Sequence, residues 1–173
     1  VDYSIFIICS LCAAFMFYLF WHELNSSSLK QNEKSIATIY FKKNVAQRRF
    51  INKSIWEKIS TETLIYNGDK IRTAEESEAY VMFDEDTKIE LGSNTMIQLF
   101  KDKKNDGTID FMNGNIHVEN TEKAKKTVIK TGTKKIQISA QTQLNVEIDK
   151  DFSNNAVIEV LQGQASVIQT DSK

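Results

Sequence analysis

The sequence predicts an all-β domain that follows a single apolar helix at the amino terminus. Three observations support this prediction. An uncharged stretch near the start is long enough for a membrane helix, the rest of the chain alternates apolar and polar residues with a period of two, and turn-forming clusters separate the alternating runs. With 173 residues, the chain holds one domain plus an appendage at most.

The uncharged stretch runs from Ile5 to Trp21 and is about 17 residues long, at the short end of the range for a membrane-spanning helix. Tyr18, Trp21 and His22 suit an aromatic, amphipathic membrane boundary. A cleavable signal peptide is the competing interpretation, but no convincing small-x-small cleavage site follows the run. We therefore expect residues 1–24 to form a retained transmembrane anchor that crosses the membrane through residues 5–21.

Both cysteines of the chain, Cys9 and Cys12, lie inside this stretch. A C-x-x-C pair can indicate redox chemistry or metal binding, but lipid offers no charge that would stabilise a thiolate. We expect both to be small apolar helix residues. Neither follows a small residue, so the pair does not fit a lipoprotein signal, and the domain beyond the anchor has no cysteine with which to form disulfides.

Residues 25–34 are polar and contain a run of serines, which predicts a short flexible tether. Charge gives a weak indication of orientation. Asp2 precedes the apolar stretch, and Lys30 and Lys34 follow it, which by itself weakly favours keeping the large domain inside the cell.

Residues 35–173 form the predicted β domain. One example of the alternation is the run in which Ala79, Val81 and Phe83 lie on one face of a strand and Tyr80 and Met82 lie on the other. The same pattern recurs at residues 36–41, 89–91, 97–99, 109–111, 116–118, 136–140, 144–148, 158–160 and 165–167. Residues 45–62 are ambiguous, because Trp56 could lie on a short helix or on a strand.

Turn-forming residues fill the gaps between these runs, at residues 67–69, 92–94, 105–107, 113–115 and 153–155. Gly68, Gly114 and Gly163 are nearly evenly spaced, and each precedes an alternating run. This weak repeat suits a stacked or rolled, solenoid-like sheet.

The composition excludes several function classes. The 22 Lys and Arg nearly balance the 23 Asp and Glu, which argues against a nucleic-acid partner. Only two histidines are present, His22 and His117, so histidine-based metal or nucleophile chemistry is poorly supplied. We expect no catalytic site, no cofactor and no small-molecule ligand, and the sequence identifies no partner-binding residue.

Two acidic segments are candidate cation sites. Asp84, Glu85 and Asp86 lack the alternating oxygen ligands and the glycine of a calcium loop, and residues 102–107 place Lys104 where a ligand should be. Both segments fit charged turns better, so no metal site is predicted. His117 alternates with apolar neighbours and is expected to be an exposed strand residue.

The stretch from Gly68 to Leu99 resembles the FecR domain family. It contains the Gly-Asp pair, an apolar residue and the Arg-Thr strand at residues 68–73, then Ser-x-Ala with alternating apolar residues from Ser77. An acidic turn and the Ile-x-Leu…Asn-Thr segment at residues 89–95 follow. Residues 110–118, 130–132 and 161–167 resemble later strands of the family, so the likeness covers residues 35–169.

The resemblance implies a FecR-like β domain anchored in the inner (cytoplasmic) membrane, with the domain in the periplasm or outside the cell. It implies a non-catalytic role in envelope signalling or regulation through contacts with an envelope protein. The alternative is a structural scaffold that binds a protein complex or the cell wall. FecR regulators carry a cytoplasmic sigma-factor-binding region before the helix, which this sequence does not show, so sigma-factor regulation is not carried over.

Overall fold

The computed structural model describes residues 3–25, 34–104, 106–132, 134–148 and 156–169. Its chain divides into two units, residues 1–33 and residues 34–173, and each is described by itself. The first unit contains the helix α1 (Tyr3–Asn25). The second contains the strands.

Helix α1 is apolar on every side. Its segment Tyr3–Trp21 has a mean hydropathy of 2.2, and none of it is buried against the protein. A helix of this length and composition can cross a membrane, which suggests single-pass anchoring. Cys9 and Cys12 are exposed free thiols on this helix.

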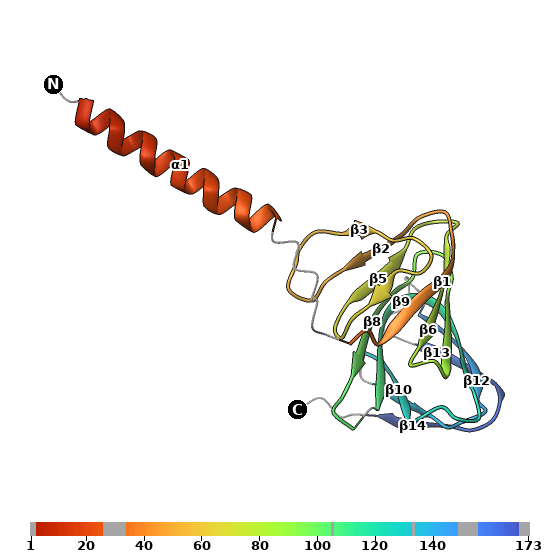
Figure 1. Ribbon diagram of the computed structural model, residues 1–173. Helices are drawn as coiled ribbons and strands as arrows, with labels where there is room; N and C mark the ends of the chain where they lie inside the picture. Colours follow the sequence, from red (N-terminus) through yellow and green to blue (C-terminus); the bar gives the residue numbers. More distant parts are fainter. Residues whose placement is uncertain (1–2, 26–33, 105, 133, 149–155, 170–173) are drawn as a thin grey trace. The chain divides into compact units, whose positions relative to one another are not determined.

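Fourteen strands in the described part of the second unit form one continuous sheet that curls around a single core (Figure 1). The all-β prediction is therefore confirmed. The strands are β1 (Ala37–Lys43), β2 (Ala46–Arg49), β3 (Glu57–Lys58), β4 (Leu64–Ile65), β5 (Lys70–Thr73), β6 (Glu78–Phe83), β7 (Thr87–Leu91), β8 (Met96–Lys101), β9 (Gly107–Asn120), β10 (Thr127–Thr131), β11 (Lys134–Ile138), β12 (Gln143–Ile148), β13 (Ala156–Gln162) and β14 (Ala165–Gln169).

The sheet has two layers. The first layer has the order β4-β1-β6-β7-β9-β12-β13, and the second has the order β3-β2-β5-β8-β9-β10-β11-β14. Neighbouring strands are antiparallel except β9 and β10, which run parallel. Strand β9 belongs to both layers, because its first half pairs with β8 and β10 and its second half pairs with β7 and β12.

The prediction of a turn at residues 113–115 is wrong. Residues 109–111 and 116–118 belong to the same strand, β9, rather than to two strands joined by a reversal. Gly114 has a φ of +95°, and the register against β8 shifts beside it, so the Asn-Gly-Asn sequence bends the strand from one layer into the other. The same residues that favour a hairpin turn also suit such a bend.

The remaining predicted turns and the ambiguous stretch at residues 45–62 have the following structures. Turns occupy residues 67–68, 93–94 and 84–86, as expected. The ambiguous stretch at residues 45–62 forms the strands β2 and β3, with Trp56 directly before β3. The predicted turn at residues 153–155 lies outside the described residues, as does Asn105 of the turn at residues 105–107.

The core follows from the alternation. Val81 is fully buried and pairs with Ile39 on one side and Ile89 on the other, while Tyr80 and Met82 face away from the core. The second layer contributes equivalent rows, such as Leu99 beside Ile109 and Ile129 beside Ile136, and one continuous apolar cluster fills the space between the layers. Burial of this apolar surface is the main force that stabilises the fold.

Three corners between strands share one hydrogen-bonding device. In each corner, a residue with positive φ precedes a buried Ser or Thr, whose hydroxyl donates to a nearby carbonyl oxygen and accepts a backbone N–H from another segment. Ser77 follows Glu76 and accepts the N–H of Val45. Thr95 follows Asn94 and accepts the N–H of Asn115. Thr142 follows Gln141 and accepts the N–H of Gln164.

The three residues that donate these N–H groups also share a feature of the backbone before them. Each follows a residue with positive φ, which is Asn44, Gly114 or Gly163. A Cβ on Gly114 would lie 2.6 Å from the Cα of Thr95, and one on Gly163 would lie 2.8 Å from the Cα of Thr142. Only glycine allows this approach, so two of the three glycines in the sequence repeat mark equivalent corners. Gly68 instead packs against Ile51.

The corner hydroxyls predict a specific cost of mutation. Thr95→Val keeps the shape of the side chain but leaves the N–H of Asn115 and a carbonyl oxygen without their buried partner. We expect the free energy of unfolding to fall by about 1–3 kcal/mol. Urea denaturation of the detergent-solubilised chain, followed by circular dichroism, measures this. Thr95→Ser retains the hydroxyl and serves as the control, and equal losses in the two variants would contradict the role of the hydrogen bond.

Candidate functional site

The outward side of the first layer carries an ordered set of polar and aromatic side chains, which we call the groove face. Strand register places one residue from each of six neighbouring strands in a row. The row consists of Phe41 on β1, Tyr80 on β6, Glu90 on β7, His117 on β9, Asn145 on β12 and Glu159 on β13. The four central members, Tyr80, Glu90, His117 and Asn145, alternate with core residues, so the burial pattern that fixes the core also presents them on the outside.

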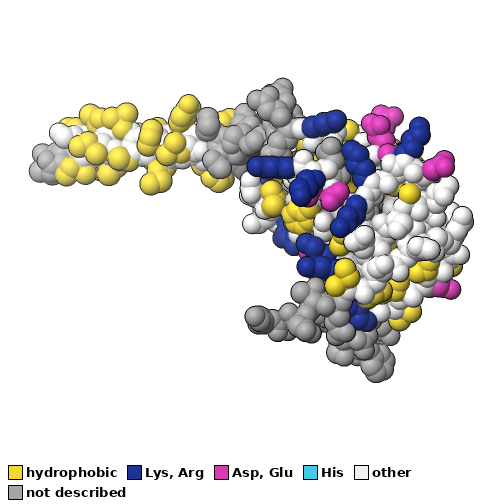
Figure 2. Space-filling view, turned by 90° about the horizontal axis from the view of Figure 1, so that it is seen from below, with side chains coloured by type: hydrophobic (Ala, Val, Ile, Leu, Met, Phe, Trp, Pro, Cys, Tyr) yellow, Lys and Arg dark blue, Asp and Glu magenta, His cyan; other side chains and the backbone are white. Residues whose placement is uncertain are grey.

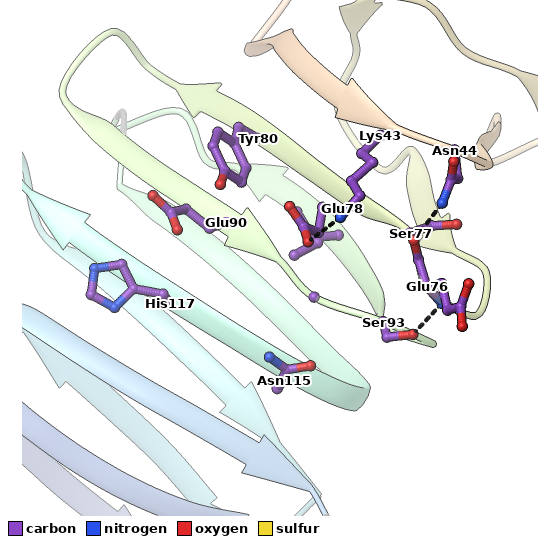
Figure 3. A pocket seen from close by; sticks show the side chains of 12 residues that line it. Lys43, Asn44, Glu76, Ser77, Glu78, Tyr80, Glu90, Ser93, Asn115 and His117 are labelled. Atoms are coloured by element: carbon purple, nitrogen blue, oxygen red, sulfur yellow. Dashed lines mark hydrogen bonds and ion pairs between the residues drawn. The ribbon is translucent and has the colours of Figure 1, made fainter.

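Two adjoining hollows lie on the groove face. The larger has a volume of about 610 Å³ and extends over β1, β6, β7 and β9. The smaller has a volume of about 280 Å³ and continues over β12 and β13. Asn115 and His117 line both. Figure 3 shows the larger hollow, in which Tyr80, Glu90 and His117 project from successive strands and an ion pair joins Lys43 to Glu78 at 3.4 Å.

A chain of hydrogen bonds orients the middle of the row. The Nδ1 of His117 lies 2.7 Å from the Oδ1 of Asn145, and the Nδ2 of Asn145 donates to Glu159 at 3.1 Å. Because an amide oxygen only accepts hydrogen bonds, His117 donates through Nδ1. His117 faces away from the core, as predicted, but it is half-buried rather than exposed.

An aromatic cluster borders the larger hollow. A β-bulge in β1 lets the consecutive residues Tyr40 and Phe41 both lie on the outside, where normal alternation would bury one of them. The ring of Tyr80 lies 5.8 Å from that of Tyr40 and 4.8 Å from that of Phe41. These rings form an exposed apolar surface next to polar groups, a composition that is enriched at binding interfaces.

Lys88 connects the aromatic and polar parts. Its ammonium group lies 2.6 Å from Glu90 and 5.4 Å from the centre of the Tyr80 ring. The hydrogen bond that Lys88 donates to Glu90 raises the pKa of Lys88, and burial raises the pKa of Tyr40. Both groups therefore keep their protons at neutral pH, with Lys88 cationic and Tyr40 neutral.

The two layers carry opposite charge on their outer sides, which the overall charge of −1 conceals. The groove face is acidic, with Glu78, Glu90, Glu119, Glu147 and Glu159 against Lys43 and Lys88. The outer side of the second layer is basic, with Arg49, Lys70, Arg72, Lys130 and Lys135 against Asp110. Figure 2 shows Lys and Arg side chains gathered over part of the β domain, with hydrophobic side chains among them.

The structure places the residues that the sequence singled out as candidate metal ligands or catalytic groups. Asp84, Glu85 and Asp86 form the β6–β7 turn, where Asp84 pairs with Lys101. Among the described residues, no group of three or more His, Cys, Asp or Glu side chains is arranged to hold a metal ion. The Nδ1 of His117 bonds to the amide oxygen of Asn145, which fixes the orientation of the imidazole ring.

Comparison with known proteins identifies the family of the β domain. The family model described as FecR protein matches residues 69–166. A protein of Treponema pallidum (strain Nichols), described as uncharacterized, is 22% identical over 147 residues, which are 84% of this chain and 22% of that protein. The chain thus spans less than a quarter of the length of this curated relative. No solved structure matches.

The pKa shifts on the groove face predict a loss of stability at alkaline pH. The ordinary values are 10.5 for Lys88 and 10.0 for Tyr40, and both are raised in the folded state. The folded chain thus binds these protons more tightly than the unfolded chain, so the contribution is complete below about pH 9 and is lost as the pH rises through the folded values.

Thermal unfolding measured from about pH 8 to about pH 11 by circular dichroism checks this prediction. Glu90→Gln removes the main cause of the Lys88 shift and should flatten the alkaline decline. Glu75→Gln, at an exposed position in the β5–β6 turn, should leave it unchanged. The same alkaline slope in both variants would show that the Lys88–Glu90 pair does not contribute.

Proposed function

The chain belongs to the FecR protein family, and from this premise we propose that it is a membrane-anchored, non-catalytic domain that acts in envelope signalling or regulation by binding another protein through the groove face. The family match covers 98 of the 173 residues, from 69 to 166. FecR proteins form a regulatory, non-enzymatic family.

Helix α1 supplies the proposed anchor, and the β domain lies on the non-cytoplasmic side of the inner membrane. The apolar, unburied surface of α1 supports the anchor. Family membership supports the placement outside the cytoplasm. The positive charges of Lys30 and Lys34, which follow the helix in the sequence, weakly favour a cytoplasmic β domain instead.

The groove face is the observation that carries the proposed contact. Its hollows adjoin an aromatic cluster, its central side chains are held in place by the His117–Asn145–Glu159 hydrogen bonds, and five glutamates give it negative charge. Preorganised side chains of this kind lose little entropy on binding. The face fits a polypeptide that presents basic and hydrogen-bond-donating side chains.

Strand addition is the second physical route to a partner on the same layer. Among the described strands, β13 pairs with β12 alone, and Val157 on it is 64% exposed. An extended segment could continue the sheet there and contact the smaller hollow, which Val157 also lines.

A single labelling experiment tests the location and the contact together. In a Cys9→Ser, Cys12→Ser background, Glu147→Cys places a thiol beside the smaller hollow, and Lys135→Cys places a matched thiol on the outer side of the second layer. A membrane-impermeant benzophenone maleimide is added to intact cells whose outer barrier has been opened. Both thiols should be labelled, and illumination should yield a protein adduct at position 147 only.

The control for specificity is His117→Ala, which removes the orienting hydrogen bond from the groove face and should reduce the adduct at least tenfold. Labelling that appears only after lysis of the inner membrane would place the domain in the cytoplasm. Equal adducts at positions 135 and 147, or an adduct unaffected by His117→Ala, would reject the groove face as the contact.

A further inference from the structure

The second layer carries a basic–aromatic patch that the proposed protein contact does not use. The patch is formed by β2, β5 and the segment between β2 and β3, and its defining residues are Arg49, Lys53, Trp56, Lys70 and Arg72. Arg49 and Lys70 are direct neighbours across the β2–β5 pair. The patch therefore lies on the opposite layer from the groove face.

Trp56 is held in the patch by two guanidinium groups. The Cζ of Arg72 lies 4.1 Å from the centre of the indole ring, and that of Arg49 lies 5.0 Å from it. Arg72 is fixed in turn, because its Nε donates to the Oε1 of Gln47 at 2.9 Å. Cation–π contacts of this kind keep an indole and two positive charges together at the surface.

Apolar side chains project beside these charges. Ile51 is 49% exposed and Ile55 is 69% exposed, and both lie in the segment that connects β2 to β3. Lys53 lies between them in the sequence, with its ammonium group 5.6 Å from the ring of Phe50. Exposed isoleucines, an indole and basic side chains on one short segment are the composition of a membrane-interfacial surface.

The charge of this region is strongly one-sided. Residues 46–58, from the start of β2 to the end of β3, contain the four basic residues Arg48, Arg49, Lys53 and Lys58, and the single acidic residue Glu57. Glu57 pairs with Arg48 at 3.2 Å, so its charge is already compensated within the protein. The remaining basic side chains produce a positive field that complements an anionic surface.

We propose that the basic–aromatic patch docks on the anionic lipid headgroups of the membrane that α1 crosses. Lys53, Lys70 and the guanidinium groups would contact phosphates, and Trp56 with the two isoleucines would enter the headgroup layer. The inference rests on the anchoring role of α1 within the proposed function. The chain between Asn25 and Ala37 spans at most about 40 Å, so docking is an intramolecular event that needs little affinity.

Docking of this kind orients the domain. The patch and the groove face lie on the outer sides of different layers, so a domain with the patch on the membrane leaves the groove face accessible to a partner. Opposite charge on the two layers strengthens this orientation, because the acidic groove face is repelled by the same lipid headgroups.

The fluorescence of Trp56 in the full chain tests the proposal. The chain has two tryptophans, and Trp21→Phe leaves Trp56 as the only one. This variant is reconstituted into vesicles of phosphatidylcholine, with or without about one third phosphatidylglycerol, and quenched with acrylamide from the aqueous side. We expect quenching to fall at least threefold in the anionic vesicles and to recover in about 1 M salt, where the Debye length is only about 3 Å.

Matched triple variants locate the effect. Lys53→Gln, Lys58→Gln and Lys70→Gln together leave the stacking on Trp56 intact, and they should lower the docked-to-undocked ratio by about fivefold per charge removed. Lys123→Gln, Lys125→Gln and Lys126→Gln together remove the same charge from the exposed β9–β10 connection and should have little effect. Circular dichroism confirms that each variant is folded.

Three outcomes would overturn the proposal: equal quenching of Trp56 in neutral and anionic vesicles, equal losses in the two triple variants, or protection by soluble polyglutamate but not by anionic lipid. The last outcome would assign the patch to an acidic protein instead. Flotation of the Trp21→Phe chain with neutral vesicles tests the anchor separately, so failure of the anchor is distinguishable from failure of the patch.

Discussion

The fold depends on buried hydroxyl groups at its corners. Where the chain passes from one strand to the next, Ser77, Thr95 and Thr142 each accept a backbone N–H that has no strand partner. Loss of the hydroxyl at one of these part-buried corners would cost about 1–3 kcal/mol. The positive-φ residues that precede these hydroxyls, and the positive-φ residues on the facing segment, are the backbone conformations that make the hydrogen bonds possible. The three corners thereby help to fix the strands that meet at them.

A fixed starting point sets the register, and the register sets the groove face. The row from Phe41 to Glu159 exists only because six strands are aligned residue by residue. A slip of one residue in any strand would turn its polar side chain into the core and its core residue outward. The same alignment separates the charges, with glutamates on the outer side of the first layer and basic residues on that of the second. The positions of the two proposed binding surfaces therefore depend on the register that the corner hydrogen bonds help to fix.

The sequence predicts those features that depend on local pattern. The alternation at Ala79, Val81 and Phe83 correctly predicts burial, because a half-buried strand has a period of two whatever it pairs with. The hydrogen bonds from His117 to Asn145 and from Asn145 to Glu159 join residues 28 and 14 positions apart, so they depend on strand order, which alternation does not encode. The sequence predicts a turn where the strand bends at Gly114, because the same Asn-Gly chemistry suits a hairpin and a kinked strand. The opposite charges of the two layers cancel in the overall composition, and their separation depends on strand pairing, which the sequence pattern does not encode.

Hydrogen–deuterium exchange of the backbone amides of Val45, Asn115 and Gln164 in the unmodified chain is the most direct test of the corner hydroxyls. If these hydroxyls hold the layers in register, the three amides exchange as slowly as the amide of Val81 in the core, because they open only when the fold opens. Exchange as fast as that of Glu85, in the exposed β6–β7 turn, would show that the corners are not what fixes the strands.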